Sequence, residues 1–438
     1  MTATEMQDVV IIGGGFTGLT AALELLKRGY SVTVLESESE IGGLAGAFDV
    51  GGEKLDKFYH HWFTNDLEVM ELINELGLNN ELIINPTNTG MYYANNFFKL
   101  STPFDLLKFT PLKFHNRIRL GFLTLMARRV KDWKSLESKT AKEWLLELGG
   151  EDVYKVVWEP LLKGKFGPYA EDVSAVWFWN KLKLRGGSRG KGGEERLVYF
   201  KGGFVSLAES LANRIRELGG NILLNQNVVK LQQSTDCWYV ETRDSRYSAR
   251  NVIATIALPL IGELVKEFAS AKYIEQLNQI KYIGNVCLVL ELRKSLSDTY
   301  WLNVNDPTFP FVGVIEHTNF ERPETYNGSH IVYLSKYLPH TDELYSMDKN
   351  EFLEYSFPFL KKMFPKFEKD WIINHYLWRA RWSQPVVGKH YSTLIPDEKT
   401  PYEGLHICSM AQIYPEDRGT NYAIREGRRI GRNVYISD

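Results

Sequence analysis

Three glycines near the start of the chain have the spacing of a nucleotide-binding loop. Gly13, Gly15 and Gly18 form a Gly-x-Gly-x-x-Gly motif. In this motif the first glycine permits a tight turn, the second lets the backbone approach a pyrophosphate, and the third lets a helix pack closely on a strand. Glu36 can accept hydrogen bonds from a pair of ribose hydroxyls, and its charge would repel a 2′-phosphate. The motif therefore predicts a bound dinucleotide that is not of the NADP type.

The surrounding sequence predicts the elements that hold this loop. Residues 9–12 are apolar and predict a buried strand that turns into a helix at the glycines. Four apolar residues then recur at helical spacing: Leu19, Ala22, Leu23 and Leu26. Gly29 stands where a C-terminal cap is expected, and residues 31–35 predict a second strand that ends at Glu36. The phosphates would lie at the positive N-terminus of the helix.

A second glycine pair distinguishes between dinucleotides. Gly42 and Gly43, followed by Leu44, have no role in a simple nicotinamide-binding fold. They would let the ribityl chain and pyrophosphate of a longer cofactor run close to the backbone. This arrangement resembles the FAD-binding signature of the superfamily that contains amine oxidases, protoporphyrinogen oxidases, phytoene desaturases and UDP-galactopyranose mutases. The resemblance implies FAD as the cofactor.

The composition is that of a globular protein with two domains. The chain has 438 residues, 44% of them hydrophobic and 24% charged, and is too long for one ordinary core. A formal net charge of −2 gives no reason to expect a nucleic-acid partner. Three widely separated cysteines without metal spacing, with no export signal or long apolar run, predict a cytoplasmic protein without a metal site.

We predict an α/β fold in which a Rossmann-type FAD-binding domain is assembled from three separated segments. These are residues 1–85, 195–265 and 385–438. Residues 86–194, with a hairpin and a helical insertion, and residues 266–384, with a large antiparallel sheet, would form an α+β substrate domain. We expect that sheet to bury one face and to offer the other to a ligand.

The resemblance also implies which later residues lie beside the cofactor. A backbone peptide at Val228 would face the adenine, and the N-terminus of the last helix would point at the flavin pyrimidine, where its amides favour the charge of a reduced flavin. The superfamily often has Gly-Asp after the last strand; this chain has Ser409 and Met410 there, and we expect Asp417 and Arg418 to replace that motif. The predicted cofactor set is Gly13, Gly15, Phe16, Thr17, Gly18, Glu36, Gly42, Gly43, Leu44, His60, Val228, Asp417, Arg418, Asn421 and Tyr422.

Residues 59–65, Tyr-His-His-Trp-Phe-Thr-Asn, predict an ordered loop before a helix. Two adjacent histidines are commonly structural. The stretch, however, resembles a loop that lies against the flavin in the mutases, with His60 at the matching position. His60 and Glu316 are the groups best suited to help with a proton, and together with Arg418 they form the predicted catalytic set.

Aromatic and cationic residues are candidates for contacts with a small-molecule substrate. The tryptophans would wall the cavity, whereas the lysines and Arg185 either meet an anionic substrate or are solvated surface cations. The predicted substrate set is Trp62, Lys163, Lys165, Arg185, Trp301, Asn319, Arg379, Arg381, Trp382 and Tyr414.

Three functions fit these residues. The first is an FAD-dependent oxidoreductase that moves a hydride between substrate and flavin N5. The second is a mutase-like enzyme in which reduced flavin acts as a nucleophile on a nucleotide sugar, with Arg379, Arg381 and Arg418 holding the diphosphate. The third is a flavin-binding protein without turnover. The substrate is not fixed by the resemblance, because relatives with the same glycine motifs act on different molecules.

Residues 103–133 alternate apolar and basic groups and predict a basic amphipathic helix. Such a helix can lie on an anionic membrane surface, which would place the protein at the inner face of a membrane as a peripheral protein. The alternative is a helix that covers the substrate domain with its arginines in water.

Overall fold

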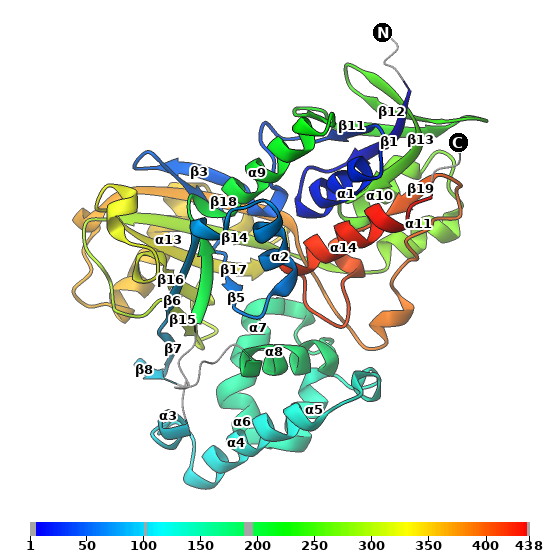
Figure 1. The fold of residues 1–438 in the computed structure, drawn as a ribbon. Coiled ribbons are helices and arrows are strands. Elements are labelled where there is room, and N and C mark those ends of the chain that lie inside the picture. The colour runs from blue at the N-terminus through cyan, green and yellow to red at the C-terminus, as the bar shows by residue number, and fades with distance from the viewer. Residues whose placement is uncertain (1–5, 100–102, 188–195, 436–438) are drawn as a thin grey trace.

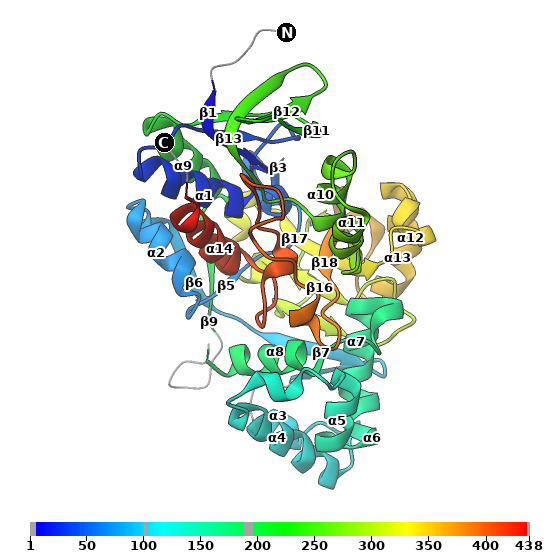
Figure 2. The ribbon, with the colours of Figure 1, turned by 90° about the vertical axis from the view of Figure 1, so that its right-hand side faces the viewer.

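The computed structural model describes residues 6–99, 103–187 and 196–435. Two large sheets and a separate group of helices make up the molecule (Figure 1). The helical group, from residues 103–187, lies at the end of the molecule opposite the N-terminus in both views (Figures 1 and 2).

The first sheet draws its strands from all three segments that were predicted to bind the cofactor. Its strands are β1 (Gln7–Ile12), β2 (Val32–Leu35), β10 (Asn221–Leu223), β11 (Val228–Gln233), β12 (Trp238–Thr242), β13 (Arg246–Ala254) and β19 (Leu405–Ile407). The order is β10-β2-β1-β13-β12-β11, with β19 paired to β13. Strands β10, β2, β1, β13 and β19 are parallel, whereas β11 and β12 are antiparallel. This arrangement confirms the predicted α/β fold built from separated segments.

Helices α1 (Phe16–Lys27), α9 (Gly203–Glu217) and α14 (Thr420–Asn433) pack beside this sheet. Two glycines bring α14 against α1: a Cβ atom at Gly427 would come within 2.0 Å of Thr20 Oγ1, and one at Gly431 within 2.7 Å of the Ala21 carbonyl oxygen. The order of these contacts shows that α1 and α14 run parallel. Their N-termini therefore point in the same direction.

Two small sheets connect the main ones. Strands β3 (Ala47–Val50) and β4 (Glu53–Asp56) form a hairpin, and β5 (Trp62–Phe63), β9 (Arg196–Phe200) and β6 (Leu82–Pro86) form an antiparallel sheet in that order. Helix α2 (Leu67–Glu75) follows β5 and packs on α14. The segment between β4 and α2 is therefore held between the two large sheets.

The second large sheet has the order β18-β14-β17-β16-β15-β7-β8. Its strands are β7 (Thr89–Tyr93), β8 (Asn96–Lys99), β14 (Tyr282–Leu292), β15 (Trp301–Val304), β16 (Gly313–Glu316), β17 (His330–Leu338) and β18 (Ile372–Pro385). All pairs are antiparallel except β15 with β7. The large antiparallel sheet predicted for residues 266–384 is therefore present.

The prediction that this sheet offers one face to a ligand stays a prediction, and the side chains of β14 are buried on both faces. In β14, Val286 and Leu288 pack toward α13 (Lys349–Met363), whereas Cys287 and Val289 belong to the core shared with α1 and α9. All four side chains are at most 1% exposed. Alternation gives β14 two faces. On the side away from α13 the sheet lies against residues 56–59, because the Tyr333 hydroxyl of β17 donates to the Asp56 carbonyl oxygen at 2.8 Å and its ring packs edge-on against Tyr59.

The helical group contains α3 (Pro103–Leu107), α4 (Phe114–Arg129), α5 (Ala141–Gly149), α6 (Glu151–Val153), α7 (Glu159–Phe166) and α8 (Ala175–Gly187). The remaining helices are α10 (Leu258–Val265), α11 (Ala271–Asn278) and α12 (Glu343–Ser346). Across the described residues, the helices are all too short or too polar to cross a bilayer.

Candidate functional site

The glycine motif forms the turn between β1 and α1. Gly13 has φ of 111°, which favours glycine, and a Cβ at Gly18 would come within 2.0 Å of the Gly13 carbonyl oxygen. A Cβ at Gly15, in contrast, would meet no atom within 4 Å. Gly13 and Gly18 are therefore required by the protein's own packing. Gly15 leaves open backbone where α1 begins.

The second glycine pair lies directly against the first. The Gly42 amide donates to the Gly14 carbonyl oxygen at 2.9 Å, and a Cβ at Gly43 would lie 3.5 Å from the Cα of Gly15. Gly42 and Gly43 both have positive φ, at 110° and 58°. We call residues 13–18 together with Gly42 and Gly43 the glycine cradle. It is a surface made almost entirely of main chain.

Glu36 closes one edge of the glycine cradle. Its carboxylate accepts hydrogen bonds from the Gly14 amide at 2.7 Å and from the Glu38 amide at 3.0 Å. The side chain is only 6% exposed. The acidic residue at the end of β2 is thus fixed beside the loop, where its oxygens can also accept from a bound sugar.

The residues predicted near the adenine and the flavin lie on two different elements, the edge strand β11 and helix α14. Val228 begins β11, at the far edge of the first sheet, and is half-buried. Asn421 and Tyr422 lie in the first turn of α14. Asn421 is already engaged, because its Oδ1 accepts from the Val69 amide at 3.1 Å and so caps α2. Sequence reasoning did not anticipate that bond between distant helices.

The chain fits a flavin dinucleotide at this place. Gly15 and Gly43 present main chain without a side chain in the way, and the N-termini of α1 and α14 point in the same direction. Two buried polar atoms nearby, His60 Nδ1 and Arg418 Nε, have no hydrogen-bond partner within the described residues. A bound molecule with polar groups would satisfy both.

His60 lies beside a buried carboxylate. Its ring stacks on Phe204 with centroids 5.1 Å apart, and Nδ1 is 3.8 Å from Asp56 Oδ2. Burial, reinforced by Arg418 and His61, lowers the pKa of His60 to about 3. At neutral pH the pair is therefore a neutral imidazole beside an acid and not an ion pair.

Asp56 was missed by the sequence analysis. It is 1% exposed, and burial raises its pKa to about 7, although hydrogen bonds from the Tyr199 hydroxyl at 2.8 Å and the Phe204 amide at 3.0 Å act in the opposite direction. The residue sits four positions before His60 in a mixed polar and aromatic stretch. Nothing local distinguishes it from a surface acid.

A charged cluster forms around Asp417, which precedes α14. Its carboxylate is 2.7 Å from Lys181 Nζ on α8 and 3.5 Å from Lys165 Nζ on α7. Gln384 at the end of β18 donates to it at 2.9 Å. Burial alone would raise the pKa of Asp417, but Lys181, Lys165 and Arg418 hold it well below its usual value. We call Lys165, Lys181, Gln384, Asp417 and Arg418 the Asp417 cluster.

Arg418 connects this cluster to residues 59–65, which we call the histidine loop. Its Nη2 donates to the Tyr337 hydroxyl at 3.3 Å, and its charge acts on both His60 and Tyr59. The predicted residues His60, Lys165, Asp417 and Arg418 are thus brought together. Lys181, Gln384 and Tyr337 complete the set; they were missed because they lie in a core-like aromatic helix and in strands.

The three predicted tryptophans have different surroundings. Trp301 packs edge-on against Tyr59, with centroids 4.8 Å apart, and so borders the histidine loop. Trp382 is half-buried and packs on Tyr282 at 5.4 Å. Trp62 is 2% exposed and stacks on Phe204 at 3.8 Å. Trp62 is therefore a core residue and does not wall an open cavity.

Glu316 and Asn319 brace a loop instead of joining the Asp417 cluster. The Glu316 carboxylate accepts from the amides of Leu296 and Ser297 at 3.0 and 2.9 Å. Asn319 donates to the carbonyl oxygens of Ser297 and Thr299 at 2.8 and 3.0 Å. Burial raises the pKa of Glu316, while these bonds lower it. The role of Glu316 in moving a proton stays a prediction, while these hydrogen bonds show that its carboxylate holds residues 296 and 297.

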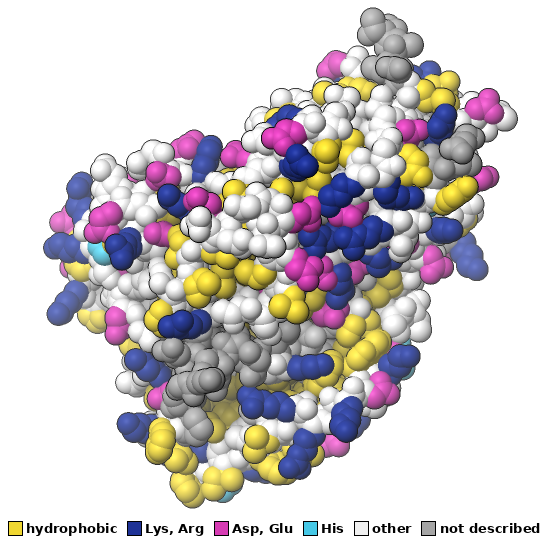
Figure 3. All heavy atoms as spheres, in the orientation of Figure 1, with side chains coloured by type: hydrophobic (Ala, Val, Ile, Leu, Met, Phe, Trp, Pro, Cys, Tyr) yellow, Lys and Arg dark blue, Asp and Glu magenta, His cyan; other side chains and the backbone are white. Residues whose placement is uncertain are grey.

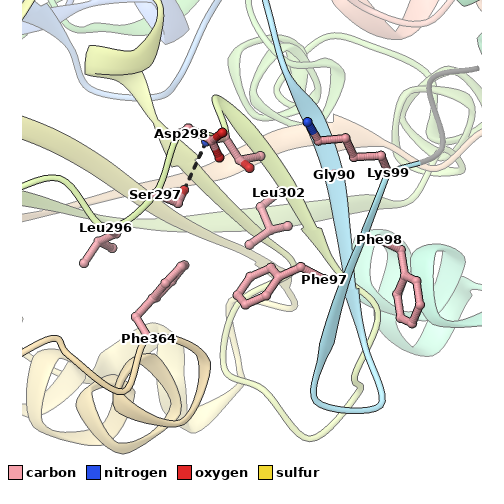
Figure 4. Close-up of a pocket in the computed structure, with 10 residues that line it drawn as sticks. Gly90, Phe97, Phe98, Lys99, Leu296, Ser297, Asp298, Leu302 and Phe364 are labelled. Carbon is pink, nitrogen blue, oxygen red and sulfur yellow. Dashed lines mark hydrogen bonds between the residues drawn. The ribbon is translucent and has the colours of Figure 1, made fainter. Parts of the chain in front are cut away.

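The loop braced by Glu316 lines a surface pocket of about 350 Å³ (Figure 4). Phe97, Leu302 and Phe364 form its apolar floor, and Asp298 and Lys99 lie at its rim. None of the described residues that line it belongs to the glycine cradle or the Asp417 cluster. The pocket is therefore separate from the site described above.

The other predicted substrate residues whose side chains are described make contacts outside the Asp417 cluster. Lys163 is exposed and pairs with Glu159 at 2.9 Å. Arg379 and Arg381 occupy exposed positions of β18, and Arg379 donates to carbonyl oxygens of residues 345 and 347. The Tyr414 hydroxyl donates to Glu137 at 2.8 Å. The side chain of Arg185 lies outside the described residues.

Comparison with known proteins supports this fold and identifies the family. A family model described as flavin containing amine oxidoreductase matches residues 16–434. A flavin-containing amine oxidase from Oncorhynchus mykiss is 28% identical over 275 residues, which cover 58% of this chain and 50% of the relative. The chain therefore spans about half the length of the curated relatives it matches.

Two solved structures share the fold. A candidate protoporphyrinogen oxidase from Exiguobacterium sp. 255-15 superposes with a TM-score of 0.76 at 16% identity, covering 98% of both chains. A reduced UDP-galactopyranose mutase superposes with a TM-score of 0.69 at 14% identity, covering 89% of this chain and 86% of the other. The fold and the glycine cradle define a flavin-dependent class of protein. The chain belongs to the flavin containing amine oxidoreductase family, and its cofactor is FAD.

Proposed function

We propose that the protein is an oxidoreductase that transfers a hydride between an organic substrate and flavin N5. The observation that carries the proposal is the glycine cradle, with its open backbone at Gly15 and the fixed carboxylate of Glu36 at its edge. When bound there, FAD supplies the two-electron chemistry, and the protein supplies position, shielding and charge.

The chain's own residues would bind the cofactor and handle the proton. Amides at the N-terminus of α1 would bind the pyrophosphate, and the N-terminus of α14 would favour negative charge on the flavin. His60 is neutral at pH 7 and its Nδ1 has no hydrogen-bond partner within the described residues, so it can orient a substrate heteroatom by accepting a hydrogen bond. Its low pKa makes it a weak base; the carboxyl group of Asp56, with a pKa of about 7 and 3.8 Å from His60, is better suited to accept the proton that leaves the heteroatom as the hydride leaves the adjacent carbon.

The charges near the site favour an uncharged or anionic substrate over a protonated amine. Lys165, Lys181 and Arg418 lie around the carboxylate of Asp417. Two further carboxyl groups lie nearby, Asp56 beside His60 and Asp66 near Lys181, but burial raises their pKa values to about 7 and about 6 and so reduces their negative charge. The local charges therefore offer no excess of negative charge to bind a cation. In this respect the chain would differ from relatives that are named amine oxidases.

The positions of three arginines argue against the mutase-like alternative. Arg379 and Arg381 lie on the exposed face of β18, and Arg418 lies beside His60. The three arginines expected to hold a diphosphate are therefore not together.

Flavin spectroscopy tests the proposal. The purified holoprotein would be mixed anaerobically with amines, alcohols and hydroxy acids that share one carbon skeleton, and the flavin absorption band followed. Bleaching by an alcohol or hydroxy acid supports the proposal. Bleaching by amines alone would overturn the substrate class, and turnover that requires prior reduction without flavin reoxidation would overturn net oxidation.

Two ligands that do not react with the flavin can test how the charge of a ligand affects its binding near Lys165. Benzoate and benzylamine differ mainly in the sign of their charge. We expect benzoate to perturb the flavin spectrum at lower concentration than benzylamine, and the preference to shrink in Lys165→Gln. Lys163→Gln is the matched control, because Lys163 lies on the same helix but pairs with Glu159 at the surface.

A further inference from the structure

Helix α4 has apolar side chains on two opposite faces. Asn116, Leu120, Leu123 and Ala127 face inward and are buried. A second set is exposed to solvent: Phe114 (63%), Ile118 (56%), Phe122 (53%) and Leu125 (56%). Their spacing of four, four and three residues places them in one stripe along the helix. The inward set explains why α4 folds onto the helical group, but it leaves the outward stripe without a partner in the described chain.

Helix α3 extends this exposed stripe. Phe104 and Leu107 are 76% and 46% exposed. Arg117 ties α3 to α4, because its guanidinium donates to the carbonyl oxygens of Leu107 and Leu112. Six of the fifteen large exposed apolar side chains of the described residues therefore lie between positions 104 and 125. We call these six residues the α3–α4 apolar face.

The charge around the α3–α4 apolar face is mostly positive. Residues 104–131 contain one acid, Asp105 on α3, and seven cations: Lys108, Lys113, Arg117, Arg119, Arg128, Arg129 and Lys131. On a helical projection Arg117 and Arg128 flank the stripe on one side and Arg119 on the other. Figure 3 shows apolar and basic side chains together at this end of the molecule.

We propose that the α3–α4 apolar face docks on the surface of an anionic lipid bilayer. An apolar stripe flanked by arginines suits a helix that lies in the bilayer interface, with its apolar side chains among the acyl chains and its cations at the phosphates. A second copy of this chain is disfavoured as the occupant, because it would bring seven further cations to the same face. The helical group also carries Lys165 and Lys181, so docking would place the bilayer on the same unit that borders the site.

Vesicle co-sedimentation of the FAD-loaded protein of residues 1–438 tests this proposal. Vesicles of phosphatidylcholine with about a quarter phosphatidylglycerol should sediment the protein, with weaker binding to pure phosphatidylcholine and at high salt. Ile118→Asn combined with Phe122→Asn should weaken partitioning about tenfold. Arg128→Gln combined with Arg129→Gln should weaken binding to the anionic vesicles only.

The control variant changes exposed apolar residues elsewhere. Val229→Asn with Ile373→Asn removes side chains that are 48% and 40% exposed and should leave vesicle binding unchanged. Flavin absorbance and thermal unfolding report that each variant is folded, and neither depends on enzymatic turnover. Absence of sedimentation with anionic vesicles, or equal losses in the test and control variants, would overturn the proposal. A dimer in solution that Phe122→Asn dissociates would also overturn it, in favour of a second copy.

Discussion

The glycine cradle and the Asp417 cluster are built in opposite ways. The cradle consists of main chain from residues 13–18 and 42–43. Its geometry depends on glycines, because a side chain at several of these positions would collide with the neighbouring backbone. The cluster uses side chains from α7, α8, β18 and the segment before α14. A main-chain site can be predicted from local sequence, whereas a side-chain site exists only after distant elements have packed.

The largest expected effect distinguishes the two kinds of glycine within the cradle. In Gly18→Ala the new Cβ would lie within 2.0 Å of the Gly13 carbonyl oxygen, so the helix and strand must separate. We expect a loss of about 3 kcal/mol or more in the free energy of unfolding, with little flavin retained. Urea unfolding followed by circular dichroism, and the flavin content of the purified protein, measure both effects.

Gly15→Ala is the matched comparison. Its Cβ would meet nothing within 4 Å in the protein. We expect the free energy of unfolding of the apoprotein to change by less than about 0.5 kcal/mol, while FAD affinity falls. Equal flavin retention in Gly15→Ala and the wild type would show that the pyrophosphate of the cofactor does not approach this residue.

The next effect concerns the Asp417 cluster. Asp417→Asn leaves the cations of Lys165 and Lys181 without their shared carboxylate. Because the Lys181 side chain is 39% exposed, water compensates part of the loss, and we expect a destabilisation of about 2 kcal/mol at neutral pH. Chemical denaturation measures it. Glu171→Gln, which removes an exposed partner of Lys142, should change stability by less than about 0.5 kcal/mol.

The pH dependence of the free energy of unfolding tests whether Asp417 is charged in the folded protein. The pKa of Asp417 is lower in the folded than in the unfolded protein. Its contribution to stability is therefore fully present above the unfolded pKa of about 3.9 and is lost as the pH falls toward the folded value. The stability difference between the wild type and Asp417→Asn should shrink on acidification below that pH. A difference that grew there would contradict the assignment of the charge on Asp417.

The same contrast explains what the sequence could predict. The strand–helix–strand unit, the glycine cradle and the antiparallel sheet follow from periodicity and glycine spacing, which are local. Asp56 and Lys181 gain their roles only from burial and from partners far along the chain, such as Tyr199 and Asp417. Glu316 shows the reverse case: the sequence suggested a role in moving a proton, and only the structure shows that its carboxylate also braces a loop.

The smallest effect tests whether cationic residues act only where the fold brings them together. Arg379 and Arg381 are exposed on β18, so replacing both by Ala should change the free energy of unfolding by about 0.5 kcal/mol and leave the flavin spectrum unchanged. Arg418→Ala, in contrast, removes a cation that lies against His60 and should shift the flavin absorption band. Thermal unfolding and absorbance spectra of the two variants provide the comparison. The opposite pattern, with flavin perturbed by the β18 variant and not by Arg418→Ala, would move the anion-binding groups to the outer strand and restore the mutase-like alternative.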